Sequence, residues 1–296
     1  MESFNQPILL KADVSLAIKR EDLLHPMVSG NKFRKLKYNL LEAKRQGLHT
    51  ILTFGGAYSN HIAAVAAAGK LYGFETIGVI RGGELEGQIG QNPTLQLAVE
   101  NGMRLVFVSR EQYRRKTDAG FIGQMRARFG PFYLVPEGGT NDLAVQGCEE
   151  ILTTADDDYD FICCPVGTGG TMAGLVRSAK PCQQVLGFAA LKGDFLQAEI
   201  LKFVNTPNWE LNTDYHFGGY AKIDASLVAF INAFKQRHGI LLDPVYTGKM
   251  LFGVMELIDK GYFPAGSKIL AIHTGGLQGI EGMNAKLKEK KLPIIQ

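Results

Sequence analysis

Three segments of the chain combine glycines with residue types that bind anions or react with carbonyl groups. The first, 164–174, reads CPVGTGGTMAG and predicts a strand, a Gly/Thr turn and a helix. Such a turn exposes successive backbone N–H groups at a helix N-terminus, where the helix dipole favours an anion. Thr168, Gly169, Gly170 and Thr171 are therefore a candidate phosphate site. A purely structural glycine turn is the alternative.

A dinucleotide-binding fingerprint, G-x-G-x-x-G, competes with this interpretation. Gly167 and Gly169 match its first two glycines, but Met172 occupies the third position. The fingerprint also requires an acidic residue about 20 residues further on, at the end of the next strand. Asp194 lies near that distance but follows Gly193, beyond the strand. A group with one phosphate therefore fits better than NAD, and no P-loop, HExxH or GxSxG motif occurs.

The second segment, 29–37, reads SGNKFRKLK and places Lys32 just after a turn, at the start of a helical pattern. A lysine near a helix N-terminus is unfavourable by about 0.3–1 kcal/mol. The helix dipole and burial would both lower the pKa of its amine, which an imine-forming lysine requires. The alternative is that Lys32 joins Arg34, Lys35 and Lys37 on a basic surface helix.

The third segment, 54–61, reads FGGAYSNH and predicts a strand, a tight turn and the start of an alanine-rich helix. Backbone amides at that helix start, together with Ser59 and Asn60, suit a substrate carboxylate and a phenolic oxygen. Serine and asparagine are also favoured helix N-caps whatever the function. A cap explains one of the two residues but not the preceding Gly55 and Gly56.

Short β-branched runs alternate with amphipathic stretches, which predicts βαβ units and mainly parallel sheets covered on both faces. The expected strands are 50–54, 76–80, 104–108, 132–135, 161–165, 184–190 and 268–273. The expected helices are 33–46, 61–72, 94–101, 142–153, 171–178, 226–237 and 249–260. Glycine pairs follow five of the strands, which favours a ligand cleft at their carboxyl ends.

Composition limits the class of protein. The 296 residues are 46% hydrophobic and 21% charged with a net charge of +3, and no basic stripe suggests nucleic acid. Four cysteines without CxxC spacing favour a reducing compartment over a disulfide framework. No signal-peptide pattern or membrane-length apolar run is present, so we expect a cytoplasmic protein that does not bind membranes.

Taken together, five ordered motifs resemble one family. They are SGNKFRKLKY (29–38), GGAYSNH (55–61), VGTGGTMAG (166–174), DPVYTGK (243–249) and HTGG (273–276). The set resembles the fold-type-II pyridoxal-phosphate enzymes, and within them the 1-aminocyclopropane-1-carboxylate (ACC) deaminase and D-cysteine desulfhydrase family. The resemblance implies two open, twisted, mainly parallel sheets flanked by helices, as in the tryptophan synthase β chain. It also implies a large domain of residues 1–35 and 141–296, a small domain of residues 36–140, and an active site between them.

The resemblance assigns roles to individual residues. Lys32 would hold pyridoxal 5'-phosphate as a Schiff base, and Lys35 would lie beside the phosphate with the 168–171 turn. Asn60 would contact the phenolic oxygen of the cofactor. Ser59, Asn60 and His61 would bind the substrate carboxylate, with Ser59 also serving in catalysis. The two catalytic tyrosines would be Tyr220 and Tyr246, either of which, taken alone, is more often a core or interface residue.

The partner of the cofactor's ring nitrogen distinguishes the activities. ACC deaminases have a glutamate after the tyrosine, where this chain has Thr247, whereas the desulfhydrases use the threonine of the HTGG turn, here Thr274. A neutral hydroxyl leaves the ring a weaker electron sink, which suits loss of a β leaving group. We therefore expect β-elimination from a small amino acid, foremost D-cysteine to pyruvate, sulfide and ammonia. ACC deamination is the second expectation, and another lyase, a racemase or a β-replacement synthase the third.

Two departures from the family pattern bear on substrate choice. Tyr58 stands where relatives commonly have glutamine, and Ala63 and Ala64 stand where they have arginine and glutamine. We expect the phenol of Tyr58 to contact the substrate and to alter the size and polarity of the pocket. The family also implies a homodimer.

Overall fold

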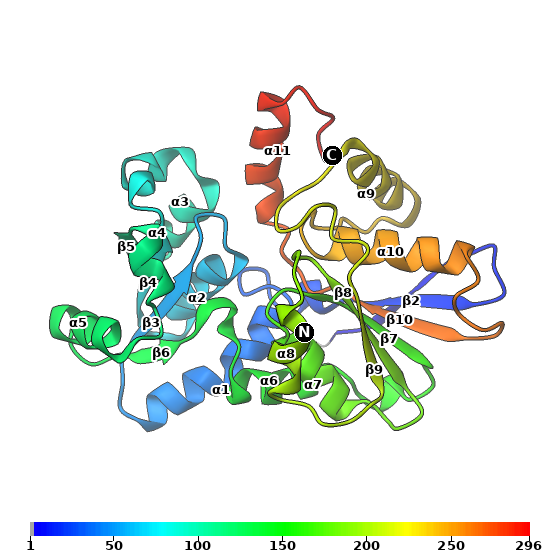
Figure 1. Ribbon diagram of the computed structural model, residues 1–296, viewed down its shortest axis with the longest axis horizontal. Helices are drawn as coiled ribbons and strands as arrows, with labels where there is room; N and C mark the ends of the chain where they lie inside the picture. The colour runs from blue at the N-terminus through cyan, green and yellow to red at the C-terminus, as the bar shows by residue number, and fades with distance from the viewer. Residues whose placement is uncertain (1–2) are drawn as a thin grey trace.

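Two separate sheets, each covered by helices, make up the protein (Figure 1). The computed structural model describes residues 3–296. The larger sheet has the strand order β1-β2-β10-β7-β8-β9 and the smaller one the order β5-β4-β3-β6. Every strand pair is parallel except β1 with β2. The predicted α/β class with two mainly parallel sheets is thus confirmed.

The larger sheet uses strands from both ends of the described chain. Its strands are β1 (Asn5–Ile8), β2 (Ser15–Lys19), β7 (Phe161–Val166), β8 (Gln184–Ala189), β9 (Trp209–Asn212) and β10 (Lys268–Ile272). Its helices are α6 (Asp142–Glu149), α7 (Gly170–Ser178), α8 (Phe195–Leu201), α9 (Ala225–His238), α10 (Thr247–Asp259) and α11 (Gly279–Glu289). Helix α1 (Asn31–Arg45) packs on α6, while its buried apolar residues belong to the core cluster of the smaller sheet.

The smaller sheet is formed by one continuous stretch of chain. Its strands are β3 (Thr50–Gly55), β4 (Glu75–Arg81), β5 (Met103–Val108) and β6 (Tyr133–Val135). Its helices are α2 (Asn60–Tyr72), α3 (Pro93–Glu100), α4 (Arg110–Arg114) and α5 (Ala119–Phe129). Short 3-10 turns lie at Glu21–Leu23, Gly83–Gln91, Glu137–Gly139 and Thr154–Asp156.

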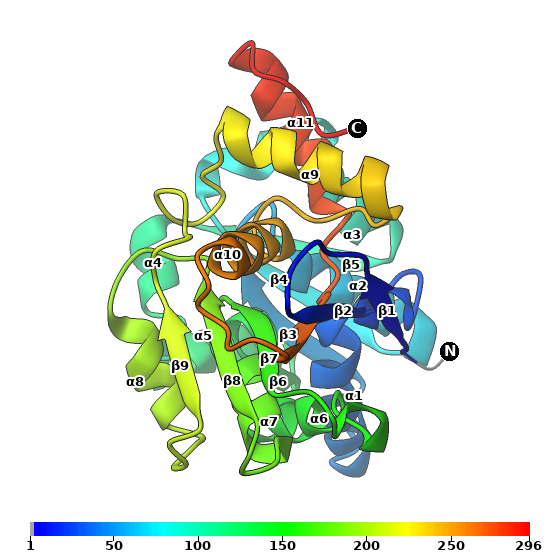
Figure 2. The same ribbon diagram turned by 90° about the vertical axis from the view of Figure 1, so that its right-hand side faces the viewer.

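The larger sheet is apolar because helices cover both of its faces. On one face, Ile231 of α9 and Val254 of α10 belong to the same buried cluster as Leu186 of β8. On the other face, Val145 of α6 and Leu175 of α7 pack against the sheet. Figure 2 shows α9 and α10 together on one side of these strands and α6 and α7 on the other.

The smaller sheet is covered in the same way. Buried alanines and Val65 of α2 pack with Leu95 of α3 on one face. Tyr113 of α4 and Phe121 of α5 pack against Phe54 of β3 on the other. The smaller sheet lies within residues 50–135. The predicted domain boundaries near residues 35 and 140 remain a prediction. Residues 1 and 2, which that prediction places in the large domain, lie outside the described residues. No helix of the described residues is long and apolar enough to cross a membrane.

Candidate active site

A cavity of about 350 Å³ lies where the glycine turns of both sheets meet. The turns after β3, β7 and β10 line it, together with the start of α1. The carboxyl ends of parallel strands share one edge of a sheet, so motifs far apart in the sequence converge there. Of the residues that the sequence assigned to the site, those lining the cavity are Lys32, Lys35, Ser59, Asn60, His61, Thr168, Gly169, Thr171, Tyr220, Tyr246 and Thr274.

Lys32 reaches the cavity because the start of α1 packs directly on the turn after β10. Gly30 precedes the helix with φ +60°, and a β-carbon there would lie 1.9 Å from the carbonyl oxygen of Thr274. That carbonyl accepts the N–H of Asn31 at 3.3 Å. Only glycine allows this approach, so the SGNK motif fixes both the backbone conformation and the position of the lysine.

The amines of Lys32 and Lys35 lie side by side in the cavity. Both donate to the carbonyl oxygen of Gly138, each at 3.2 Å, and Lys35 also donates to Thr140 Oγ1 at 2.9 Å. Burial and the neighbouring charge of Lys35 hold the pKa of Lys32 well below 10.5. Burial also lowers the pKa of Lys35. Lys32 is thereby favoured as a neutral nucleophilic amine, as the sequence predicted for a carbonyl-binding lysine.

The turn after β7 provides a second group of donors. Gly169 is the N-cap of α7 with φ 82° and supplies no side-chain cap. The buried N–H groups of Gly170, Thr171 and Met172 make no hydrogen bond to other described residues. Gly170 does not line the cavity, but a β-carbon on it would lie 3.2 Å from the amine of Lys35.

An anion fits this corner of the cavity. Unpaired amides at a helix N-terminus, the amine of Lys35 and the Thr168 hydroxyl lie close together, which is a donor set that suits a phosphate group. The side chain of Asn31 donates to Thr171 Oγ1 at 2.8 Å and so ties the start of α1 to the start of α7. The sequence did not single out Asn31, whose signal was only its place between Gly30 and Lys32.

The turn after β3 presents the start of α2 to the cavity. Ser59 is the N-cap, and its Oγ accepts the N–H of Ile62 at 3.3 Å. The cap interpretation therefore holds for Ser59, while Asn60 and His61 still line the cavity. The N–H groups of Asn60 and His61 donate to no other described residue, which leaves them open to a carboxylate.

His61 is almost fully buried at 2% exposure. Its Nε2 lies 2.8 Å from Thr53 Oγ1, and its Nδ1 has no hydrogen-bond partner among the described residues. Burial, followed by the charges of Lys32 and Lys35, holds its pKa well below 6.5. His61 is therefore a neutral ring at neutral pH and adds no positive charge to the cavity.

Two tyrosines form the opposite wall. The rings of Tyr220 and Tyr246 meet edge to face with centroids 6.4 Å apart. Burial raises the pKa of both phenols, that of Tyr246 well above 10. Both remain protonated at neutral pH and can donate a hydrogen bond or a proton into the cavity. A β-carbon on Gly167 would lie 3.0 Å from the Tyr246 ring, so this glycine makes room for the tyrosine.

Tyr58 lies elsewhere than the sequence suggested. Its side chain does not line the cavity. The amine of Lys286 on α11 lies 4.0 Å from the centre of its ring, and a β-carbon on Gly282 would come within 2.7 Å of the ring. Tyr58 thus joins the smaller sheet's first turn to the C-terminal helix, and its contact with a substrate remains a prediction.

Sequence reasoning missed two charged residues at the cavity, Arg81 and Glu137. Arg81 ends β4 and makes no ion pair within residues 3–296, whereas Glu137 pairs with Lys116 at 3.3 Å. Each stands beside a glycine pair that marked a strand end, Gly82-Gly83 and Gly138-Gly139. The glycine pairs were the available signal, but they do not indicate which neighbouring side chain faces the cavity.

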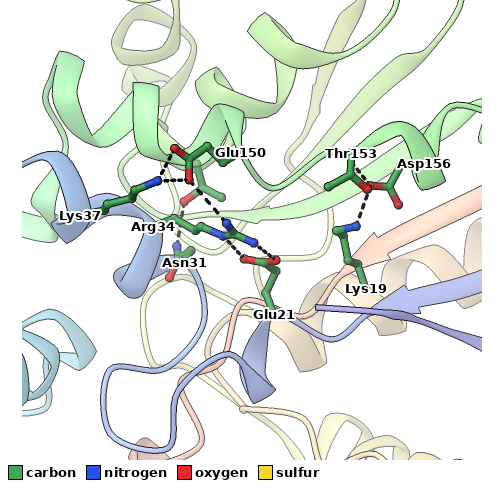
Figure 3. Close-up of polar contacts among 9 residues, drawn as sticks. Lys19, Glu21, Asn31, Arg34, Lys37, Glu150, Thr153 and Asp156 are labelled. Carbon is green, nitrogen blue, oxygen red and sulfur yellow. Dashed lines mark hydrogen bonds and ion pairs between the residues drawn. The ribbon is translucent and has the colours of Figure 1, made fainter. Parts of the chain in front are cut away.

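A charged network fixes the helix that carries Lys32 (Figure 3). Arg34 donates to both oxygens of the fully buried Glu21, at 2.9 and 3.0 Å, and also lies 3.7 Å from Glu150. Lys37 donates to Glu150 at 2.6 Å. Arg34 and Lys37 therefore hold α1 against the 21–23 turn and the end of α6 and do not line the cavity. Lys32 and Lys35 of the same helix face the cavity.

Comparisons with known proteins agree with this geometry. The family model described as "Pyridoxal-phosphate dependent enzyme" matches residues 7–275. A Thermotoga maritima protein named "Putative 1-aminocyclopropane-1-carboxylate deaminase" is 32% identical over 94% of this chain and 93% of its own length. The Arabidopsis thaliana "Bifunctional D-cysteine desulfhydrase/1-aminocyclopropane-1-carboxylate deaminase, mitochondrial" is 30% identical over 90% of this chain and 73% of its own length.

A solved structure has the same fold. It is titled "Crystal Structure Analysis of the ACC deaminase homologue" and superimposes with a TM-score of 0.80 at 29% identity. The match covers 98% of this chain and 94% of the other.

Proposed function

Because the chain belongs to the pyridoxal-phosphate dependent enzyme family, we propose that it removes sulfide and ammonia from D-cysteine by β-elimination. The balanced reaction converts D-cysteine and water to pyruvate, sulfide and ammonia. Desulfhydrase and deaminase names both occur among its relatives, at 30% and 32% identity. The choice between them depends on this chain's own residues.

The cavity fits the cofactor. The unpaired amides of Gly170, Thr171 and Met172 would hold its phosphate, with Lys35 and Thr168 beside them. Lys32, with its lowered pKa, would hold its aldehyde carbon. When bound, the cofactor supplies an electron sink that stabilises a carbanion at the α-carbon of an amino acid.

Two groups of residues then bind the substrate and move its proton: those at the start of α2, and Lys32 on α1. The N–H groups at the start of α2, with the hydroxyl of Ser59, bind the substrate carboxylate and so fix the direction of the α-hydrogen. Lys32 Nζ, once released by the incoming substrate amine, is the base that takes the α-proton, because burial favours its neutral form. Lys32 Nζ holds this proton until the product forms and then releases it, which regenerates the neutral amine.

The tyrosine wall faces the leaving group. Tyr220 and Tyr246 have phenols with raised pKa values, so both stay protonated at neutral pH and the pair can donate a hydrogen bond to a departing thiolate. Thiolate is a good leaving group that needs hydrogen bonding more than full protonation. The wall therefore suits a small sulfur-containing substrate in a cavity of about 350 Å³.

The hydrogen bonds of Thr247 are the observation that supports β-elimination over ACC deamination. Its hydroxyl donates to Asp243 Oδ1 at 2.8 Å and accepts the N–H of Asp243 at 2.9 Å, and it does not line the cavity. Thr274 does line the cavity. Of the described residues lining the cavity, Glu137 is the one carboxylate, and Lys116 pairs with it. The ring nitrogen would thus meet a hydroxyl and no glutamate at the position after Tyr246, which favours β-elimination.

A direct assay of products tests this function. Purified protein with pyridoxal phosphate should release pyruvate and sulfide in equal amounts from D-cysteine, and Lys32→Ala protein should release neither. Formation of 2-oxobutyrate from ACC at a comparable kcat/KM would contradict the argument from Thr247. Absence of any 2-oxo acid from either substrate would contradict the proposed function as a whole.

ACC deamination is the second candidate, since the Thermotoga relative carries that name and the Arabidopsis relative carries both. It is favoured by the close pair of protonated phenols, which could assist opening of a strained ring. The same assay decides between the two.

A further inference from the structure

Lys249, the last residue of the DPVYTGK motif, has no part in the reaction outlined above. It lies in the first turn of α10 and is 1% exposed, so its charge is buried. It makes no salt bridge within the described residues 3–296. Buried charges are costly unless hydrogen-bonded, so this lysine calls for an explanation.

The partners of Lys249 are two carbonyl groups of a single loop. Its Nζ donates to the carbonyl oxygen of His216 at 2.9 Å and to that of Gly219 at 2.8 Å. The same carbonyls close two successive turns, in which the N–H of Gly219 bonds His216 at 3.0 Å and the N–H of Lys222 bonds Gly219 at 3.1 Å. Tyr220 is the residue that follows the shared carbonyl of Gly219.

The loop, residues 213–224 between β9 and α9, is conformationally strained. Phe217 and Ala221 have φ 53°, and Gly218 and Gly219 have φ 88° and 118°. Positive φ is disfavoured for residues with a β-carbon, so this loop needs external contacts to hold its shape. Burial lowers the pKa of Lys249 to about 8, which leaves it mostly charged at neutral pH and able to make charge-assisted hydrogen bonds.

The other tyrosine is fixed from the same helix start. Tyr246 is the N-cap of α10, three residues before Lys249. Asp243 accepts the N–H groups of Val245 and Tyr246, at 2.9 and 3.0 Å, and that of Thr247 at 2.7 Å. One turn of helix therefore determines where both phenols of the cavity wall stand.

We propose that Lys249 is a positioning residue that holds the 213–224 loop through two carbonyls and thereby sets the place of the Tyr220 hydroxyl in the active site. The inference rests on the proposed function only in taking Tyr220 to act during turnover. It accounts for the whole DPVYTGK motif as a support for two tyrosines, with Asp243 capping the helix and Lys249 binding the loop.

Hydrogen exchange tests the structural half without any activity. In Lys249→Met, the near-isosteric side chain without the charge, amides of 213–224 should exchange faster while those of 247–259 keep their protection. Lys260→Met, at the exposed C-cap position of the same helix, is the matched control and should leave both segments unchanged. Unchanged exchange in 213–224 would overturn the proposal, as would equal loss of protection throughout α10.

A double-mutant cycle with Tyr220→Phe tests the functional half. Lys249→Met should lower kcat by about ten-fold or more in the wild-type background, since a small misplacement of a catalytic group is costly. It should lower kcat little further in Tyr220→Phe protein. A double mutant whose loss of kcat equals the full product of the two single losses would overturn the proposal, because a general structural defect acts regardless of Tyr220.

Two controls keep the outcomes separate. Wild-type protein without turnover of D-cysteine contradicts the proposed function, and the exchange result still decides the role of Lys249. Should Lys249→Met not fold, Lys249→Gln takes its place, because its polar amide is tolerated at a polar site while the shorter, uncharged side chain loses the charge-assisted hydrogen bonds to the loop. It should show the same faster exchange confined to 213–224, and unchanged exchange there would again overturn the proposal.

Discussion

At the scale of single residues, two kinds of basic side chain lie in and around the site. Some lose their charge more easily because they are buried, and others keep their charge and stabilise the structure through ion pairs. Lys32 and His61 lose their charge more easily than usual because they are buried beside other positive groups. Arg34 and Lys37, in the same segment as Lys32, stay charged in ion pairs with Glu21 and Glu150. Position relative to the cavity, and not residue type, decides which of these basic side chains has a lowered pKa.

The buried ring of His61 predicts a dependence of stability on pH. Its pKa is held below 6.5 in the folded state, so the unfolded chain binds the proton more readily. Stability is therefore full above about pH 6.5 and falls as the pH drops towards the folded pKa, by up to about 1.4 kcal/mol per pH unit. His61→Gln should lose less stability than wild type between about pH 7.5 and about pH 5 in urea unfolding.

The exposed His49 provides the control for this measurement. His49→Gln should keep the wild-type slope of stability against pH. An identical slope for His61→Gln and wild type would contradict the neutral, buried state of His61.

At the scale of elements, the site depends on helix starts that fit against glycine turns. The start of α1 lies on the turn after β10, and the start of α7 lies beside Lys35. At the start of α7 the first three N–H groups have no side-chain cap and no partner among the described residues, so they are left for a ligand. The start of α1 instead bonds its first three N–H groups to backbone carbonyls, so that fit positions Lys32 and supplies no free backbone donor.

Gly30→Ala tests the fit of α1 on the turn after β10. The new β-carbon would lie 1.9 Å from the Thr274 carbonyl at a residue with φ +60°. We expect a loss of about 3 kcal/mol or more in the free energy of unfolding, together with weaker cofactor binding. Gly47→Ala has a similar φ of +68° and nothing within 4 Å, so it should cost only about 1–2 kcal/mol. Equal losses in chemical denaturation would show that the close approach to Thr274 has no energetic weight.

At the scale of the whole molecule, the cavity exists because two sheets turn their carboxyl ends toward one place. The smaller sheet contributes Ser59, Asn60 and His61, and the larger contributes the 168–171 turn, Thr274 and the tyrosine wall. Tyr58 and Lys286 join the turn after β3 to α11 at the side of the same cavity. Neither sheet alone would hold both ends of an amino acid on its cofactor.

Much of this arrangement follows from the sequence. Strong β-branched runs and helical periods predicted the strands β3 to β8 and β10, while the short strands β1, β2 and β9 and the helices α4, α5 and α8 escaped prediction. β1 and β9 are edge strands that are partly exposed and lack a continuous apolar run, so their sequences do not differ from loops. β2 lies inside the sheet and is buried, but it is only five residues long. The sequence also did not indicate which side chains beside a turn face the cavity, as those of Arg81 and Glu137 do.

Tyr58 and Lys249 show the same limit from opposite directions. Tyr58 lies within a motif several of whose other residues line the cavity, yet its ring turns to α11. Lys249 lies at the end of a motif that was quoted only for its tyrosine, yet it bonds a loop about 30 residues earlier in the chain. Both outcomes depend on contacts between distant segments, which local spacing does not determine.

The covalent attachment of the cofactor tests the central claim most directly. Borohydride reduction of the protein with pyridoxal phosphate, followed by peptide mapping by mass spectrometry, should place the adduct on Lys32. Lys35, whose amine bonds the same Gly138 carbonyl, is the internal control and should be unmodified. Lys32→Ala protein should show neither the adduct nor the visible absorbance of the bound cofactor. An adduct on Lys35 or another lysine, or the absence of any adduct on the wild-type protein, would contradict the account.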